Sequence, residues 1–254
     1  VLARGGGRLP NEGEFFGLLL LATVGLLLLV GSEELLLIFI GLELTGLSLY
    51  VLTAFDKRDP RSAEAGLKYL LFGSVASAFT LFGLSYVYGS TRTTALSAIA
   101  EQLHAGPIAP LLIAGVVMTL IVFAFTVAAP PFHLWSPVAY LVAPAPAAAL
   151  IASWSPVASF VVLGKIVLLG FGPLQGSAGW HALVAGWSPV LAVLAALSIL
   201  VGNLTALAQR NVRRLLASSA VAHAGHTFLG PVAGRHGGAR APLSHPPPQP
   251  VALP

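Results

Sequence analysis

The sequence predicts an all-α fold, a polytopic transmembrane helix bundle of about seven helices, one of them broken near Pro130–Pro131. Of the 254 residues, 56% are hydrophobic and only 9% are charged, whereas a soluble domain carries about 25% charged residues. The mean hydropathy is +0.87. Several apolar runs reach the roughly 20 residues that a helix needs to cross the hydrocarbon core of a bilayer. This composition is typical of a protein that crosses the membrane several times.

Seven apolar segments follow one another along the chain. We expect helices at residues 14–31, 35–54, 66–89, 108–129 with a broken continuation to about 141, 145–170, 184–208 and 213–230. Together they form one transmembrane bundle over residues 14–230. Residues 1–13 are a polar N-terminal segment, and residues 231–254 are a Pro/Gly-rich tail that should be irregular. Between the third and fourth segments, "LSAIAEQL" predicts a short amphipathic helix at the membrane surface.

The basic residues are distributed unequally between the two sides of such a bundle. Seven crossings place on one side Arg4, Arg8, Lys57, Arg58, Arg61, Arg210, Arg213 and Arg214, and on the other side Arg92, Arg235 and Arg240. Loops that stay in the cytoplasm or matrix carry the excess of Lys and Arg. The first side is therefore predicted to face the cytoplasm or matrix.

Glu43 and Lys68 are the first candidates for chemistry inside the membrane. A charge at the centre of a membrane helix costs at least about 2.5–3.5 kcal/mol on insertion scales, so ionisable residues there are functional candidates. Glu43 lies near the middle of the second segment and Lys68 one turn inside the third. An ion pair between the two helices would offset both desolvation costs. Two interpretations stay open, a proton-handling pair and a static pair with Lys68 reaching toward the surface.

Two histidines are the next candidates. His133 follows Pro130 and Pro131, which remove backbone donors and interrupt the helix. Non-helical backbone at membrane depth is tolerated only where protein or water satisfies it, and histidine exchanges protons near neutrality. His223 follows the hydroxyls of Ser218 and Ser219 by one turn. Each histidine either belongs to a polar path or only satisfies nearby backbone and packing contacts.

Several site classes are excluded. The chain has no cysteine, which excludes disulfides and thiolate metal sites. "RGGGR" does not join a strand to a helix, so it is no phosphate-binding loop. His223 and His226 share a helical face, but a third metal ligand is missing. We therefore expect no cofactor and no metal.

The ordered motifs of the chain resemble a known family. "GLELTGLSLYVLTAFDKRDPRSAEAGLKYLLFGSVASAFTLFG", "PPFHLWSPVAYLVAPAPAAALIASWSPVASF" and "QRNVRRLLASSAVAHAGHTFLG" resemble antiporter-like subunit 2, the bacterial subunit N type, of respiratory complex I, the proton-pumping NADH:quinone oxidoreductase. The resemblance covers about residues 14 to 234.

This resemblance implies a membrane-arm subunit that moves protons while quinone is reduced elsewhere in the complex. Glu43 and Lys68 would match the family's glutamate–lysine pair, and His133 and His223 its two histidines. The chain would be a subunit of an enzyme without redox catalysis of its own. The implied partners are other membrane-arm subunits, a second polypeptide that completes the bundle, and lipids. Neither a nucleic acid nor a small-molecule substrate beyond protons is implied.

The sequence also departs from the family's pattern. Thr126 and Pro156 stand where the family has lysines, and Lys165 lies nine residues from Pro156, about 13.5 Å along a helix and on the opposite face. Both ends are shorter than in full-length members. These departures favour the alternative of a largely structural subunit that no longer pumps. Because truncation fits a reduced organellar subunit, we expect the mitochondrial inner membrane, with the bacterial plasma membrane as the alternative.

Overall fold

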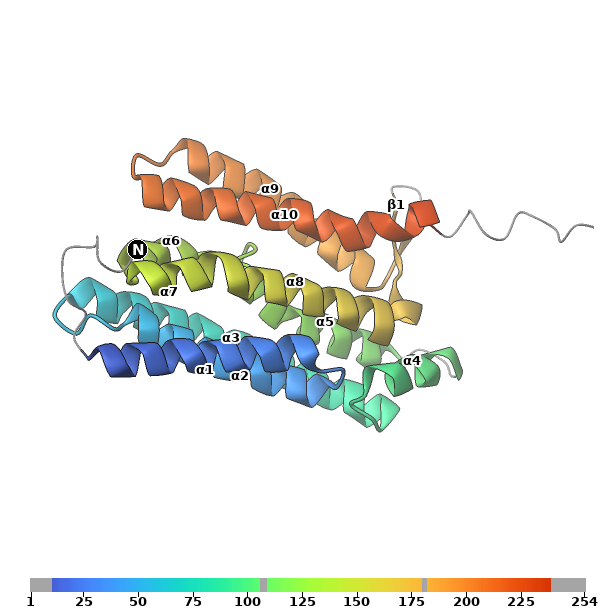
Figure 1. Cartoon of the computed structure of the whole chain (residues 1–254). Coiled ribbons are helices and arrows are strands. Elements are labelled where there is room, and N and C mark those ends of the chain that lie inside the picture. Colours follow the sequence, from blue (N-terminus) through green and yellow to red (C-terminus); the bar gives the residue numbers. More distant parts are fainter. Residues whose placement is uncertain (1–10, 106–108, 180–181, 239–254) are drawn as a thin grey trace, which may run out of the picture.

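The computed structural model describes residues 11–105, 109–179 and 182–238. Its long helices run side by side along one axis (Figure 1). The first part of the chain forms α1 (Glu12–Gly31), α2 (Leu35–Thr53), α3 (Pro60–Thr91), the short α4 (Leu96–Ala105) and α5 (Pro110–Thr126). The second part begins with α6 (Ser136–Val142). A continuous helical stretch follows, made of α7 (Ala145–Ala149), η2 (Leu150–Trp154), α8 (Ser155–Lys165) and η3 (Ile166–Gly170). The last elements are η4 (Gly172–Leu174), α9 (Trp187–Leu207) and α10 (Val212–Gly238).

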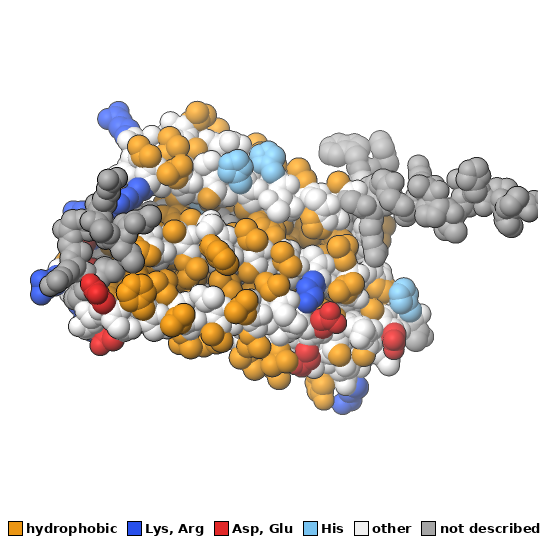
Figure 2. Space-filling model, in the orientation of Figure 1, with side chains coloured by type: hydrophobic (Ala, Val, Ile, Leu, Met, Phe, Trp, Pro, Cys, Tyr) orange, Lys and Arg blue, Asp and Glu red, His pale blue; other side chains and the backbone are white. Residues whose placement is uncertain are grey.

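The predicted fold class is confirmed. Five helical stretches are long and apolar enough to cross a membrane, namely α1, α2, α3, the stretch Ala145–Gly170 and α9. The 17-residue α5 and the 27-residue α10 complete the seven predicted segments among the described residues. Figure 2 shows apolar side chains over the long sides of the bundle and charged ones mostly near its ends. Leu20, Leu27 and Leu204 are at least 66% exposed, as expected of side chains that face lipid.

Three boundaries differ from the prediction. The third helix begins at Pro60, because Asp59 accepts a hydrogen bond from the backbone N–H of Arg61 and proline suits the first helical turn. A short hairpin, β1 (Ser177–Gly179) with β2 (Ala182–Val184), precedes α9 and delays its start to Trp187. The expectation that residues 231–238 are irregular was wrong, since α10 continues past Pro231 to Gly238 with Val232 packed on the core. Residues 239–254 and 1–10 lie outside the described residues.

Neighbouring helices approach one another at small residues. A Cβ atom on Gly41 of α2 would come within 2.8 Å of the Leu29 backbone nitrogen in α1, and one on Gly202 of α9 would lie 2.5 Å from the Ala222 nitrogen in α10. Without a strong hydrophobic drive in lipid, such close backbone contact is a main source of helix association. The chain therefore packs as helix pairs, with α1 on α2, α3 on α5, and α9 on α10.

The break in the fourth predicted segment lies where the prolines predict it. Helix α5 ends at Thr126, Ala128 adopts a left-handed φ of 56°, and a turn containing the cis Pro130–Pro131 bond leads to α6. Trp135 closes this turn, because its indole N–H donates to the Phe125 carbonyl at 3.1 Å. Its ring also stacks on Tyr69 of α3 with a centroid distance of 4.1 Å.

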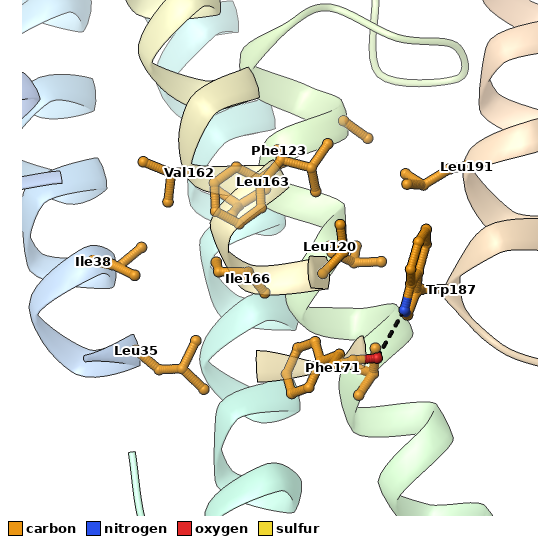
Figure 3. Close-up of a cluster of buried hydrophobic side chains, with 14 of the residues drawn as sticks. Leu35, Ile38, Leu120, Phe123, Val162, Leu163, Ile166, Phe171, Trp187 and Leu191 are labelled. Carbon is orange, nitrogen blue, oxygen red and sulfur yellow. Dashed lines mark hydrogen bonds between the residues drawn. The ribbon is translucent and has the colours of Figure 1, made fainter. Parts of the chain in front are cut away.

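A large apolar cluster joins the helices at the other end of the bundle. Figure 3 shows members of this cluster from four parts of the chain, namely Leu35 and Ile38 of α2, Leu120 and Phe123 of α5, Val162, Leu163, Ile166 and Phe171 of the α8–η3 region, and Trp187 and Leu191 of α9. The indole N–H of Trp187 donates to the Phe171 carbonyl at 2.8 Å. Helix α4 adds Leu96, Ile99 and Leu103 and keeps Glu101 exposed, which confirms its predicted amphipathic character.

The two most basic junctions lie at the same end of the bundle. Lys57 and Arg58 stand between α2 and α3 with Arg61 in the first turn of α3, and Arg210, Arg213 and Arg214 stand at the α9–α10 junction. Figure 1 places both junctions at the left end, as the predicted topology requires. Of the other basic residues used in that prediction, Arg4, Arg8 and Arg240 lie outside the described residues, as does the side chain of Arg235.

Candidate functional site

A small cavity lies among α1, α2, α3, α5 and α8, at the middle of the first helices. Glu43 lines it, together with the hydroxyl-bearing residues Thr45, Ser77, Thr126, Ser155 and Ser159 and the phenols of Tyr50 and Tyr69. The space open to the centre of a water-sized sphere is about 20 Å³, enough for one water molecule. Leu26, Leu29, Leu42 and Leu49 form part of its apolar wall. Glu43 thus lines a nearly enclosed cavity and is itself half-buried.

Three hydroxyl groups of this cavity donate hydrogen bonds within the protein. Ser77 of α3 donates to the Glu43 carboxylate, Thr45 donates to the Gly41 carbonyl at 2.9 Å, and Thr126 donates to the Val122 carbonyl at 2.8 Å. Ser159 is 1% exposed, and its hydroxyl oxygen has no hydrogen-bond partner in the described structure. The cavity thus places a few hydroxyl groups beside the carboxylate within a mostly apolar wall.

The predicted contact between Glu43 and Lys68 is wrong. Lys68 forms an ion pair with Glu64 one turn earlier on its own helix, and both side chains are about half exposed. The residue of α3 that meets Glu43 is Ser77, nine residues from Lys68 and so about 13.5 Å farther along the axis. The sequence argument identified the correct neighbouring helix but not the level at which α3 passes Glu43.

His133 lies in the turn between α5 and α6, as predicted. The residue is half-buried, and its Nδ1 atom is inaccessible to solvent and has no hydrogen-bond partner of good geometry in the described structure. The Pro131 carbonyl is near enough to interact with the ring. His133 is not among the residues that line the Glu43 cavity.

His223 lies on an outer face of the protein. It is exposed on α10, with its ring centroid 6.4 Å from that of His226. Histidine side chains also gather over α9 and α10 in Figure 2. Ser218, one turn earlier, is buried at 3% exposure, so the serine and the histidine face different surroundings. The continuous polar line from Lys68 through Thr126 and His133 to His223 is not formed within the described part of the chain.

The two replaced lysine positions have different surroundings. Thr126 lines the same cavity as Glu43, so one of the two replaced positions shares a site with the carboxylate. Pro156 lies in the first turn of α8, directly after the π-helical η2; a proline offers no N–H for the helical pattern, which changes here from π to α. Ser155, its neighbour, lines the cavity.

Lys165 does not replace either lysine. Its ammonium group donates to the carbonyls of Val30 at 3.0 Å and Ser32 at 2.9 Å, at the C-terminal end of α1. A cation there satisfies unpaired carbonyls and opposes the negative end of the helix dipole. The predicted poor fit of Lys165 to a relay position thus has a structural reason, since this side chain fastens α8 to α1.

Residues 32–245 match the family described as NADH:quinone oxidoreductase/Mrp antiporter, TM. The chain belongs to this family. It is 50% identical over 221 residues to NADH-quinone oxidoreductase subunit N 2 of Acidobacterium capsulatum, which covers 87% of this chain and 44% of the relative. It is 41% identical over 220 residues to NADH-quinone oxidoreductase subunit N of Moorella thermoacetica, with coverage of 87% and 44%.

Solved structures share the fold of this family member. A chain of respiratory complex I from Thermus thermophilus with bound Aureothin matches with a TM-score of 0.73 and 35% identity, over 91% of this chain and 47% of the other. A chain of the membrane-bound sulfane sulfur reductase, an archaeal respiratory membrane complex, matches with a TM-score of 0.77 and 26% identity, over 90% and 45%. The sequence spans about half the length of these relatives.

Proposed function

We propose that the chain is a multi-pass membrane-arm subunit of a proton-pumping NADH:quinone oxidoreductase, and that Glu43 is the group through which it takes part in proton movement. The family match over residues 32–245 supports membership in such a complex. The observation that carries the role of Glu43 is its cavity, where a carboxyl group deep in α2 meets the Ser77 hydroxyl and space for one water. A carboxyl group in this setting can accept and release a proton.

His133 and Lys68 have lesser roles in this proposal. His133, with its shielded Nδ1 atom at the helix break, is the proposed exchange group between the cavity and the next polar element. Lys68 is held by Glu64 at a half-exposed position, so it acts at the entrance on the basic side of the bundle. His223 is exposed on the outer face of α10. In this proposal it exchanges protons only with a polar group of a partner subunit that covers this face.

The proposed partners are the other membrane-arm subunits of the complex, a second polypeptide or segment that completes the bundle, and lipids. The relatives and structures reported above come from respiratory complexes of several subunits, which supports this assembly. The redox chemistry belongs to other subunits, so this chain serves an enzyme without itself transferring electrons. The relatives are bacterial, which favours a bacterial plasma membrane over the mitochondrial inner membrane.

A second candidate function, a largely structural subunit, has one specific observation in its favour. The cavity has Thr126 where the family's pattern has a lysine, and no ion pair to Glu43 exists among the described residues. A threonine cannot hold a proton as an ammonium group does. In this alternative Glu43 only fills its cavity and accepts the hydrogen bond from Ser77.

One measurement separates the two candidates. The proton-to-electron ratio is determined for the complex in sealed vesicles with wild-type chain, with Glu43→Gln and with Glu101→Gln, the last an exposed carboxyl of α4. The proton-carrying function predicts a lower ratio in Glu43→Gln alone, at unchanged quinone reduction per complex. Equal ratios in all three preparations would establish the structural function. Absence of the chain from any redox complex would reject both.

A further inference from the structure

A groove at the basic end of the bundle is separate from the Glu43 cavity. It lies between the first turns of α10 and the segment formed by α6, α7 and η2, and its volume is about 280 Å³. Figure 1 shows α6 and the start of α10 side by side at the left end, where the α9–α10 junction lies. Small-molecule sites begin at about 300 Å³. The groove is therefore large enough for part of an organic molecule.

The walls of this groove are apolar and consist of short side chains. Besides Tyr140 and Leu216, its apolar lining is Ala143, Ala145, Ala148, Ala149, Ala152, Ala217 and Ala220. Three of these alanines, at positions 145, 149 and 152, are exposed, so the groove opens to the surroundings of the bundle. A hydrocarbon chain can lie against such a wall, because its contacts there are van der Waals contacts that need no hydrogen bond.

Arg213 is the charged residue that lines the groove. Its Nη1 atom donates to the Leu141 carbonyl at 3.0 Å, which holds the guanidinium group between α10 and α6. A guanidinium group carries several N–H donors in a fixed fork, so most of them stay available for a ligand. This fork matches two oxygens of a phosphate group. Arg213 thus provides a place for a phosphate at the mouth of the groove.

The positive charge around Arg213 is not neutralised within the described part of the chain. Arg210 and Arg214 lie near it in the sequence, and all three side chains are exposed, at the end of the bundle where Figure 2 shows Lys and Arg side chains. The one ion pair among the described residues joins Lys68 to Glu64, and no Asp or Glu is among the described residues that line the groove. The N-terminal end of α10 adds partial positive charge. The groove therefore favours a partner with net negative charge.

We propose that this groove binds one anionic phospholipid, with its phosphate on Arg213 and one acyl chain along the alanine wall. Basic clusters beside membrane helices attract anionic lipid head groups. An apolar wall with cations at one end matches the two parts of such a molecule. A zwitterionic phospholipid or an apolar helix of another subunit would match the wall but would leave the arginines without a counter-charge. The proposal rests on the position of the chain in a membrane and not on proton movement.

The test is photo-crosslinking in the purified complex that carries the full-length chain, reconstituted in phosphatidylcholine nanodiscs. A trace of phosphatidylglycerol or of phosphatidylcholine is added, each with the same diazirine-bearing acyl chain, and cross-linked peptides are located by mass spectrometry. Phosphatidylglycerol is expected to label residues 143–152 and 216–220 at least about tenfold more than phosphatidylcholine does, because several arginines attract its charge. Unlabelled phosphatidylglycerol should compete. Glycerol phosphate, which has the charge but no acyl chain, should not compete at the same concentration.

Two charge variants locate the head group. Arg213→Gln should lower the preference for phosphatidylglycerol about tenfold, as for loss of a charge-assisted hydrogen bond. Arg213→Lys keeps the charge but not the fork, so it should retain part of the preference. Arg58→Gln removes an exposed charge at the same end of the bundle that does not line the groove, and it should keep the wild-type preference.

A third variant locates the acyl chain. Ala148→Phe should fill the groove and abolish labelling by either lipid, whereas Ala196→Phe, at an exposed position of α9 outside the groove, should leave labelling unchanged. Thermal unfolding and co-purification with the complex check that each variant is folded.

Equal labelling of the groove by the two lipids, or an unchanged preference in Arg213→Gln, would overturn the proposal. Absence of lipid labelling in the wild-type groove would also overturn it, since a protein segment would then cover this surface. Competition by glycerol phosphate would reduce the site to a phosphate site without an acyl chain and would overturn the choice of a lipid. The proton-to-electron ratio is a separate readout, so failure of this proposal and failure of the proposed function can be told apart.

Discussion

Two regions of the molecule carry ionisable side chains on membrane helices, and they differ in their surroundings. Glu43 lies in a nearly enclosed cavity among α1, α2, α3, α5 and α8. His223 and His226 stand exposed on α10. The carboxyl group already has hydroxyl neighbours within this chain. The two histidine rings lie 6.4 Å apart, and His226 Nδ1 contacts the Ala222 carbonyl of its own helix at 2.9 Å. The sequence identifies both regions in the same way, as ionisable residues on apolar helices. Only the packing of the helices shows that Glu43 lines a cavity whereas the histidines are exposed.

A substitution at the contact between α9 and α10 is expected to have the largest effect on stability. Gly202→Leu places a side chain where α9 meets α10, since even a Cβ would lie 2.5 Å from the Ala222 nitrogen. Overpacking against backbone should reduce the free energy of unfolding by about 3 kcal/mol. We expect the α10 face to be released while the Glu43 cavity persists. Thermal unfolding and protease sensitivity of the α9–α10 junction measure this, with Gly164→Leu, where a Cβ contacts nothing, as control. Equal damage from both substitutions would contradict the close approach.

A second change weakens the cavity region alone. Trp135→Phe removes the indole N–H that satisfies the buried Phe125 carbonyl and leaves the ring beside Tyr69, which lines the cavity. The Phe125 carbonyl keeps the hydrogen bond from the Ala128 backbone N–H at 2.9 Å, so losing the bond from the indole should cost about 1.5 kcal/mol of unfolding free energy. Denaturation of the purified chain gives the value, and Trp154→Phe, 66% exposed, serves as the control. If the two variants unfold alike, the Trp135 bond contributes nothing.

A third change removes the fastening of α8 to α1. Lys165→Met leaves the carbonyls of Val30 and Ser32 without their donor. We expect a loss of about 1 kcal/mol, because the group is partly exposed and partly replaced by water. The melting temperature should fall for Lys165→Met but not for Lys57→Met, whose side chain is exposed in the α2–α3 junction. An unchanged melting temperature for Lys165→Met would show that water replaces the ammonium group without loss.

The smallest effect is expected at Lys68. Lys68→Gln breaks only a half-exposed pair with Glu64, and exposed pairs contribute little to stability. The melting temperature should stay at the wild-type value, and the proton-to-electron ratio should fall by less than in Glu43→Gln, because Lys68 lies only at the proposed entrance. A ratio as low as that of Glu43→Gln would restore the pairing that the sequence suggested, in a conformation other than the one described.

The sequence predicted the fold well because the relevant signals are local. The hydropathy pattern predicted the long helices, Pro130 and Pro131 predicted the break, and "LSAIAEQL" predicted the amphipathic α4. The hairpin before α9 was missed because its strands, of three residues each, are too short to show a clear period. The end of α10 was predicted too early, because Pro231 and the following glycines favour a helix end there. The helix continues to Gly238, and Val232 packs on the core.

The candidate site was only partly predictable. Glu43 and His133 stand out in a sequence because ionisable residues are rare in membrane helices. The partner of Glu43 depends on the level at which α3 crosses α2, and the contact with Ser77 leaves no mark on the hydropathy pattern. The available signal was Thr126, which departs from the family's lysine and does line the same cavity. Whether His223 faces inward or outward depends on the rotation of α10, which sequence alone could not settle.

The central claim is that Glu43, and not the histidines on α10, takes up and releases the proton that this chain moves. Infrared difference spectra recorded during NADH-driven turnover test it most directly, because a carboxyl group that gains or loses a proton changes its C=O stretching band. The account predicts a turnover-linked carboxyl band that is absent in the complex with Glu43→Gln and present with His223→Gln. A band that persists in Glu43→Gln, or disappears only in His223→Gln, would contradict the account.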